Sequence, residues 1–182
     1  MKKIILIVGM PGSGKSFATD IIKRKFKAEV FHSGDVIREE IKKRGLKYTP
    51  ENDTKIADWF HSKGRDRLIV LRTWNKIKKS KKKLVVIEGF RSFPEYIYLK
   101  NLSKSNPTII AVLSPFSVRV KRELQRGRFG KEETVSYLKE RDRNEKKRGL
   151  EKLMKKAKVK INNSKLSKKQ MEKRIVELAK KI

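Results

Sequence analysis

One short segment constrains this chain more than any other: an apolar run that ends in a glycine-rich loop and a lysine. Residues 4–8 read Ile-Ile-Leu-Ile-Val, which is typical of a strand buried on both faces of a parallel sheet. Residues 9–16 read Gly-Met-Pro-Gly-Ser-Gly-Lys-Ser and fit the pattern G-x-x-x-x-G-K-[ST]. Apolar residues at helical spacing follow. A strand before this pattern and a helix after it predict a phosphate-binding loop.

The loop predicts a site for ATP and Mg²⁺. Its glycines let backbone amides turn inward around an anion, and the dipole of the following helix adds positive potential. We expect Lys15 to reach the outer phosphates and Ser16 to hold Mg²⁺. The expected ATP-binding residues of this segment are Gly9, Pro11, Gly12, Ser13, Gly14, Lys15, Ser16 and Phe17. The pattern does not say whether the phosphate goes to water or to a second substrate.

The rest of the chain alternates strands with helices. Apolar runs predict further strands over 29–32, 84–87, 108–113 and 159–161. Helical spacing predicts helices over 16–26, 35–44, 66–79, 117–126 and 134–148, with others opening at Thr49, Ser92 and Ser167. Such alternation implies right-handed crossovers. We therefore expect one α/β domain over 1–182 with the three-layer P-loop NTPase fold: a five-stranded parallel sheet, helices on both faces and a short lid.

The cysteine count and the lengths of the apolar runs limit the classes of protein to which this chain can belong. The absence of cysteine excludes disulfide scaffolds, zinc knuckles, thiolate catalysis and iron–sulfur clusters. The apolar run at 4–8 is shorter than the roughly 7 to 15 residues of a secretory signal. No run approaches the ~20 apolar residues of a membrane helix. We expect a cytoplasmic protein without a membrane partner; the oligomeric state cannot be inferred from the sequence.

The net charge admits a nucleic acid as a partner. Lys and Arg number 50 against 20 Asp and Glu, a formal charge of +30, and such an excess attracts phosphates whatever their sequence. However, 35 of the 50 are lysines spread over every segment, whereas a binding face would concentrate them. Lysine enrichment is also a composition bias of hyperthermophile proteins. An ATP-gated RNA-binding or assembly protein with little kinase turnover therefore remains an alternative.

Two further motifs stand where strands are expected to end. Ser33-Gly34-Asp35-Val36-Ile37-Arg38 follows the second strand, and Glu88-Gly89-Phe90-Arg91 follows the third. They resemble the T-G-D-x-x-R and D-G-F-P-R signatures of adenylate kinase and related nucleoside monophosphate kinases. The resemblance spans nearly the whole chain and is closest to an adenylate-kinase-related group in archaea. Later positions that resemble the family are Arg122, Arg126, Arg141, Arg143 and the segment Asn162-Asn163-Ser164.

The resemblance implies an ATP-dependent phosphotransferase that moves the γ-phosphoryl group to an acceptor phosphate, with AMP the first acceptor to test. Residues 35–80 would form the acceptor-binding insertion and residues 119–145 the lid region. The acceptor would contact Ser33, Gly34, Arg38, Gly89, Phe90, Arg91 and Tyr96. Lys15, Arg122, Arg126 and either Arg141 or Arg143 would neutralise the transferring phosphoryl group, while Arg122 and Asn163 would face ATP.

Two acids complete the predicted site. Asp35 and Glu88 are expected to orient Mg²⁺ through its bound water. The alternative for Asp35 is a helix N-cap. Dephospho-coenzyme A kinases, which this chain also resembles in fold, use an Asp after the second strand as a base on a ribose hydroxyl, and in that case Asp35 would be the base. Glu88 replaces the family's aspartate, and Tyr96 stands where adenylate kinases read adenine with glutamine. We interpret His32 and His61 as structural.

Overall fold

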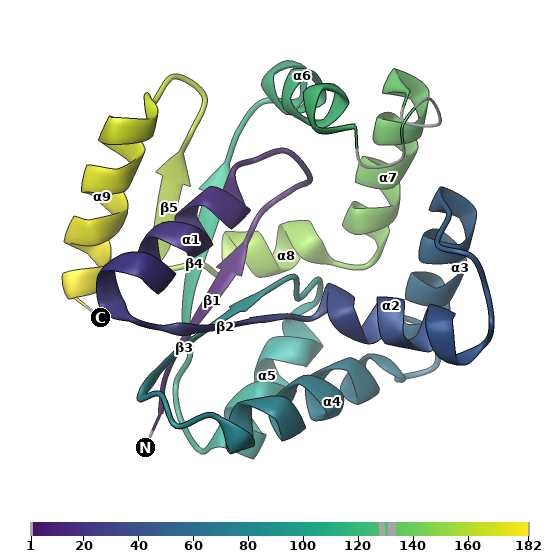
Figure 1. Cartoon of the computed structure of the whole chain (residues 1–182), viewed down its shortest axis with the longest axis horizontal. Helices are drawn as coiled ribbons and strands as arrows, with labels where there is room; N and C mark the ends of the chain where they lie inside the picture. Colours follow the sequence, from purple (N-terminus) through teal and green to yellow (C-terminus); the bar gives the residue numbers. More distant parts are fainter. Residues whose placement is uncertain (1, 128–129, 131–133, 182) are drawn as a thin grey trace.

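The computed structural model describes residues 2–127, 130 and 134–181 and confirms the predicted fold class (Figure 1). The strands are β1 (Lys3–Val8), β2 (Glu29–His32), β3 (Leu84–Glu88), β4 (Thr108–Leu113) and β5 (Val159–Asn162). They form one sheet in the order β2-β3-β1-β4-β5, and every pairing is parallel. All five predicted strands are therefore present, and their carboxyl ends share one edge of the sheet.

Helices cover both faces of the sheet. They are α1 (Lys15–Phe26), α2 (Gly34–Lys43), α3 (Pro50–Phe60), α4 (Asp66–Lys79), α5 (Phe93–Ser103), α6 (Phe116–Arg126), α7 (Val135–Lys147), α8 (Leu150–Lys155) and α9 (Lys168–Lys180). Helices α1 and α9 lie on one face, and α4, α5 and α8 lie on the other (Figure 1). Among the described residues, no helix has the length and apolarity needed to cross a bilayer.

The core follows the two-residue period of a strand. In β1, Ile4, Leu6 and Val8 pack into the cluster beneath α4, α5 and α8, whereas Ile5 and Ile7 pack into the cluster beneath α1 and α9. Because successive side chains of a strand point to opposite faces, a continuous apolar run is needed where both faces are covered. The two helix pairs α2–α3 and α6–α7 extend from the ends of β2 and β4, on either side of the glycine-rich loop (Figure 1).

Several predicted helix starts are confirmed. Thr49 caps α3 by accepting a hydrogen bond from the amide of Asn52 at 3.3 Å, with Pro50 at the first helical position. Ser92 and Ser167 each form a reciprocal capping box at the starts of α5 and α9. These interactions satisfy amides that the first turn of a helix leaves without a partner.

Three local predictions were wrong or incomplete. The helix predicted over 117–126 begins one residue earlier, at Phe116, and is not capped by Ser117; it follows directly after Pro115, whose fixed φ suits the junction. Asp35 is not the N-cap of α2, because Ser33 holds that position and Asp35 lies in the first turn. The six-residue helix α8 was not predicted; Gly149, at φ +103°, separates it from α7. The connection between the helices predicted over 117–126 and 134–148 falls largely outside the described residues.

Candidate active site

The glycine-rich loop joins β1 to α1 and has the backbone of an anion-binding nest. Gly12 and Gly14 take positive φ values of +73° and +93°, a region that residues with a Cβ rarely adopt. A Cβ on Gly12 would also lie 2.5 Å from the Arg119 carbonyl oxygen. Lys15, at the first position of α1, donates to the Met10 carbonyl oxygen at 3.4 Å. The loop therefore needs glycine where the pattern places it, and Lys15 curls back over the loop.

Two predicted nucleotide-contacting residues brace this loop from outside. Arg122 of α6 donates through Nη1 to the Gly12 carbonyl oxygen at 3.3 Å and through Nη2 to the Asn163 carbonyl oxygen at 2.9 Å. Asn163, which follows β5, donates through Nδ2 to the Ser13 carbonyl oxygen at 2.9 Å. These bonds connect the loop to α6 and to the segment that follows β5. The contacts of Arg122 and Asn163 with ATP stay predictions.

A buried ion pair holds α6 to α7 behind the loop. Arg119 donates through Nη1 to Asp142 Oδ1 at 2.8 Å and to the Pro11 carbonyl oxygen at 3.1 Å, and through Nη2 to Asp142 Oδ2. No role was predicted for either residue from the sequence. A fork-shaped guanidinium that meets both carboxylate oxygens fixes orientation as well as distance, so the loop and α7 are positioned by the same arginine.

Ser16 and Glu88 meet where the sequence predicted a Mg²⁺ site. The Ser16 hydroxyl donates to Glu88 Oε1 at 2.9 Å. Glu88 is buried, and its Oε2 has no hydrogen-bond partner among the described residues, with His32 Nδ1 3.7 Å away. A hydroxyl and a carboxylate oxygen are ligands that suit Mg²⁺, which usually takes one or two carboxylates, water and substrate phosphates. Accordingly, the described residues contain no group of three acidic, His or Cys side chains that could hold a metal unaided.

Asp35 lies apart from this pair. Its carboxylate accepts a hydrogen bond from Arg38, three residues further along α2, and its side chain is 43% exposed. Asp35 does not line the cleft described next. The geometry therefore joins Glu88, but not Asp35, to Ser16.

A cleft of about 460 Å³ opens between the glycine-rich loop, α2–α3 and α7. Ten predicted site residues line it: Lys15, Ser16, Ser33, Gly34, Arg38, Glu88, Gly89, Arg91, Arg126 and Arg141. The structure thus brings together motifs that are more than a hundred residues apart in the chain. Gly89, at φ +109°, leaves no room for a Cβ, which would lie 2.6 Å from Ser33 Oγ. Glycine there allows the ends of β2 and β3 to approach.

Two predicted acceptor residues lie outside the cleft. Phe90 is fully buried in the core beneath α4, α5 and α8. Tyr96 is on α5, where its ring stacks on Phe93 with a centroid distance of 5.6 Å and packs against the same core. The structure therefore supports core packing for Tyr96 and not contact with an acceptor base, because its ring packs against the core and does not line the cleft.

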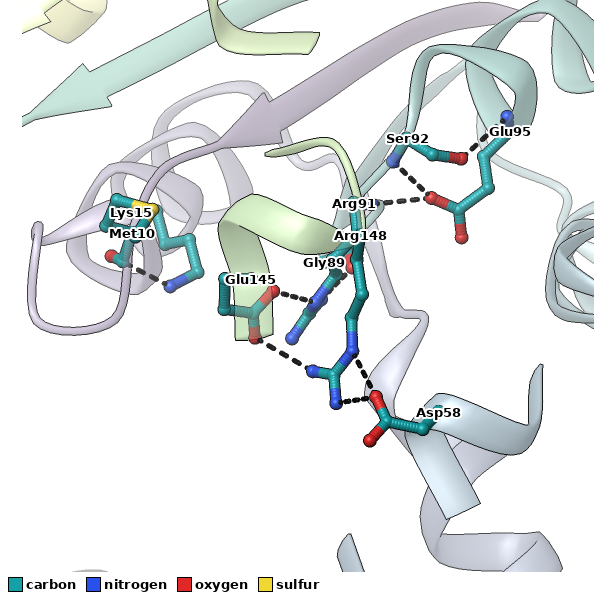
Figure 2. Close-up of polar contacts among 9 residues, drawn as sticks. All are labelled: Met10, Lys15, Asp58, Gly89, Arg91, Ser92, Glu95, Glu145 and Arg148. Carbon is teal, nitrogen blue, oxygen red and sulfur yellow. Dashed lines mark hydrogen bonds and ion pairs between the residues drawn. The ribbon is translucent and has the colours of Figure 1, made fainter. Parts of the chain in front are cut away.

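Three residues that sequence reasoning missed form a charge network across the cleft (Figure 2). Glu145 of α7 accepts from Arg91 Nε at 2.8 Å and lies 3.7 Å from Arg148 Nη1. Arg148 in turn donates through Nε and Nη2 to Asp58 of α3 at 3.0 and 2.6 Å. The Arg91 guanidinium also donates to the Gly89 carbonyl oxygen. One feature of the sequence could have indicated this network. Positions 141, 145 and 148 are four and three residues apart, so their charged side chains share one face of the helix predicted over 134–148.

The network sets the charge of Glu145. Burial alone would raise the pKa of this carboxyl, but the Arg91 and Arg148 guanidiniums outweigh burial and lower its pKa to about 2. Glu145 is therefore ionised throughout the physiological range. A second buried acid, Glu95, accepts from the amides of Arg91 and Ser92 at 2.6 and 2.7 Å, and burial raises its pKa to about 7. Arg91 is thus held at its side chain by one acid and at its backbone by another.

Helix α3 and the residue that caps its C-terminus, His61, contribute two further groups to the cleft. Burial lowers the pKa of His61 to about 3, so this imidazole is neutral. Burial also raises the pKa of Asp53, although Arg141 and Arg91 oppose that shift. Opposite them, Arg141 donates to Glu123 at 3.1 Å, and Arg126 carries a side chain that is 61% exposed. The cleft walls therefore combine several arginines with a small number of acids.

The position of Lys15 leads to a pH prediction. Burial lowers the pKa of its ammonium to about 8, with Glu88 opposing this shift and Arg91 adding to it. Phosphates would favour the charged form, so binding takes up a proton once the free protein has lost it. We expect Mg-ATP affinity to be level near neutral pH and to fall as pH rises above about 8, by at most about tenfold per pH unit.

Fluorescence titration with Mg-ATP at a series of pH values measures this dependence. Lys15→Met is the matched control, because methionine fills the same space without an ionisable group, and its profile should be level over that range. A level profile for the natural protein would contradict the prediction.

Comparisons with known proteins place this geometry in a family. The model of the AAA domain matches residues 8–139. A UPF0200 protein of Thermococcus onnurineus is 34% identical over 182 residues, covering 98% of this chain and 97% of its own. The chain belongs to the UPF0200 family. A second member, from Hyperthermus butylicus, is 35% identical over 139 residues, covering 76% of this chain and 73% of its own. These UPF0200 relatives carry no adenylate kinase name, so that finer resemblance stays a prediction.

Solved structures show the same fold in kinases. A putative kinase from Chloroflexus aurantiacus matches this UPF0200 chain with a TM-score of 0.65 and 14% identity, covering 100% of this chain and 98% of that one. Shikimate kinase from Bacteroides thetaiotaomicron matches with a TM-score of 0.62 and 14% identity, covering 98% of each chain. At such identity the likeness establishes a P-loop kinase-like fold and leaves the substrate open.

Proposed function

We propose that this UPF0200 protein is an ATP-dependent phosphotransferase that moves the γ-phosphoryl group of Mg-ATP to the phosphate of a small acceptor, with AMP the first acceptor to test. The observation that carries the proposal is the convergence of Lys15 and Ser16 with Arg38 and Arg91 on one cleft. The loop residues suit the outer phosphates of ATP, and the two arginines suit a second phosphate. Arginine forks hold two phosphate oxygens at once.

The chain's residues would act by position and charge. In the reaction an acceptor phosphate oxygen forms a bond to the γ-phosphorus, the bond from that phosphorus to the β,γ-bridging oxygen breaks, and ADP leaves with the electron pair. Lys15 and Arg141 would neutralise the charge on the moving group. Ser16 and Glu88 would hold Mg²⁺, which when bound neutralises charge on the β- and γ-phosphates. An acceptor phosphate is already a nucleophile, so no general base is required.

One observation supports a phosphate acceptor over a hydroxyl acceptor. A hydroxyl acceptor needs a base, and the predicted base, Asp35, pairs with Arg38 and does not itself line the cleft. We also assign the acceptor side to residues 35–80, which include α3 and α4, and the lid to residues 119–145, which include Arg126 and Arg141. Both assignments rest on the cleft lying between these parts.

An acceptor screen tests the proposal. ADP release from Mg-ATP is measured with AMP, with other nucleoside monophosphates, with dephospho-coenzyme A and with no acceptor. We expect a nucleoside monophosphate to raise turnover at least tenfold, and Arg91→Lys, which keeps the charge but loses the fork, to weaken that acceptor's apparent affinity more than that of ATP. Stimulation by dephospho-coenzyme A alone would replace the phosphate acceptor with a hydroxyl, and no stimulation by any acceptor would reject the kinase.

A further inference from the structure

Three lysine-rich segments come together at the amino end of the sheet, opposite the cleft. They are residues 2–3, residues 23–27 at the end of α1 and residues 78–83 at the end of α4, and together we call them the basic end. The N-terminus and the ends of α1 and α4 lie on the same side of the molecule (Figure 1). This follows from the fold, because each helix of a parallel α/β unit returns the chain to the amino end of the sheet.

Hydrogen bonds hold these segments together around Ser80. The Lys2 ammonium donates to the Ser80 and Lys82 carbonyl oxygens at 2.5 and 3.1 Å. The Lys3 amide donates to the Lys83 carbonyl oxygen at 2.8 Å. The Ser80 hydroxyl donates to Glu29, the first residue of β2, which follows the α1 segment by two residues. The basic end is therefore one continuous surface and not three separate loops.

The basic end carries eleven Lys and Arg side chains and no acid within its own segments. All but Lys2 belong to exposed residues. Within the described parts of the chain, Lys25 is the member that lies within 4.0 Å of a carboxylate, that of Glu172 at 3.1 Å. The dipoles of α1 and α4 favour cations in their last turns. They do not account for Lys2, Lys3, Lys27 or residues 81–83, which lie beyond those turns.

We propose that the basic end binds the phosphate backbone of a nucleic acid, independently of the cleft. The fold brings ten of the 35 lysines, from three segments that are distant in the sequence, to one end of the molecule, which weakens the sequence-based argument against such a face. Lysine is a point charge without a planar fork, and the segments present no exposed aromatic ring for base stacking. Binding should therefore be independent of sequence and governed by counterion release.

The chemistry of the surface distinguishes this partner from others. Membrane-surface segments insert large apolar side chains, and the centres of protein interfaces are depleted of charge and rich in apolar residues. None of the large apolar side chains that are exposed in the described parts of the chain belongs to the basic end. A dense, unpaired cationic surface without apolar anchors fits a polyphosphate chain better than a bilayer or a protein.

Binding of labelled nucleic acids to the full chain tests the proposal. Fluorescence anisotropy is measured with single-stranded RNA and with DNA of the same sequence, about 20 nucleotides long so that one site is filled, over a series of salt concentrations. The variant is the triple charge reversal of residues 81–83, Lys81→Glu/Lys82→Glu/Lys83→Glu. We expect it to weaken binding at least tenfold at about 0.1 M salt and to reduce the salt slope by about 2, the value for three lost phosphate contacts.

A matched triple variant separates location from net charge. Lys165→Glu/Lys168→Glu/Lys169→Glu changes the charge by the same amount at exposed positions between β5 and the start of α9, at the other end of the sheet. We expect this variant to bind RNA and DNA nearly as tightly as the natural protein. We expect the same of Lys15→Met, because Lys15 lies in the cleft and not in the basic end. Circular dichroism checks that each variant is folded.

Three outcomes would overturn the proposal. They are an equal loss of binding in both triple variants, no binding of either polymer by the natural protein at about 0.1 M salt, and tighter binding to vesicles containing anionic lipid than to RNA or DNA. A preference for RNA or for DNA identifies the polymer and supports the proposal. A failed acceptor screen has no bearing on these measurements, because the basic end and the cleft share no residue.

Discussion

Replacing Lys15 by methionine is expected to lower ATP turnover at pH 7 by about 10³-fold or more without lowering the thermal stability of the free protein. Turnover and stability respond differently because the Lys15 ammonium stabilises bound phosphate, whereas in the ligand-free protein its charge is partly removed from water and is unfavourable. Lys15 is half-buried, and removal of its ammonium from water is the largest influence that disfavours its charge. Arg91 and Arg141 add to that cost, while Glu88 and Glu145 oppose it. The methionine side chain keeps most of the packing and removes the charge.

ADP release under saturating acceptor and a thermal melt without ligand measure the two effects. Lys173→Met, at an exposed position of α9, is the control and should change neither. A Lys15→Met enzyme that retains turnover within about tenfold would show that Lys15 does not stabilise the transferring phosphoryl group, since such donors contribute 10²-fold or more. A fall in melting temperature would contradict the argument from burial.

Replacing Glu145 by alanine is expected to destabilise the protein by about 3–5 kcal/mol, the usual cost of removing one partner from a buried charge network. The loss leaves Arg91 without its carboxylate, and among the described residues Arg148 keeps one ion-pair partner, the exposed Asp58. For a chain of this size, each kcal/mol shifts the melting temperature by about 2–4 °C. Glu140→Ala, an exposed acid on the same helix, should stay within about 0.5 kcal/mol of the natural protein.

Anions and acid provide two further measurements on the same variant. Added pyrophosphate should raise the melting temperature of Glu145→Ala more than that of the natural protein, because it supplies negative charge to the uncompensated arginines. The pKa of Glu145 falls from 4.5 in the unfolded chain to about 2 in the fold. Its stabilisation is therefore complete above pH 4.5 and is lost as pH falls toward 2. A variant as stable as the natural protein at pH 7 would show that the network does not stabilise the fold.

The sequence predicted features that depend on neighbours in the chain. The strand, loop and helix around Lys15 follow from a local pattern, and the capping boxes at Ser92 and Ser167 depend on residues three positions apart. Likewise, a buried parallel sheet needs continuous apolar runs, which are visible without knowing how the strands are ordered. These parts of the fold could therefore be predicted before any tertiary contact was known.

Features that depend on distant pairs could not be predicted in this way. Glu145 stands in a helix where nearly every residue is polar, and nothing local marks it as the acid that meets Arg91. Arg122 was expected to face the nucleotide, but in the structure its guanidinium also braces the loop carbonyl groups. Tyr96 was expected to contact the acceptor because it stands where adenylate kinases read adenine, but its ring packs against the core. In each case the deciding partner lies in another element.

The strand order has a consequence for how the chain is made. β1 precedes the other four strands of the sheet in the chain, yet it lies at the centre, where Lys3 pairs with Leu84 and Ile5 pairs with Thr108. Its apolar run therefore has neither neighbour until β3 has been synthesised, nearly half-way along the chain, and it lacks the second neighbour until β4 follows. Sheets built from such distant pairings form slowly, and unpaired apolar strands tend to aggregate. The high positive charge of the nascent chain, through repulsion between copies, would help keep this strand apart from its equivalents on neighbouring ribosomes.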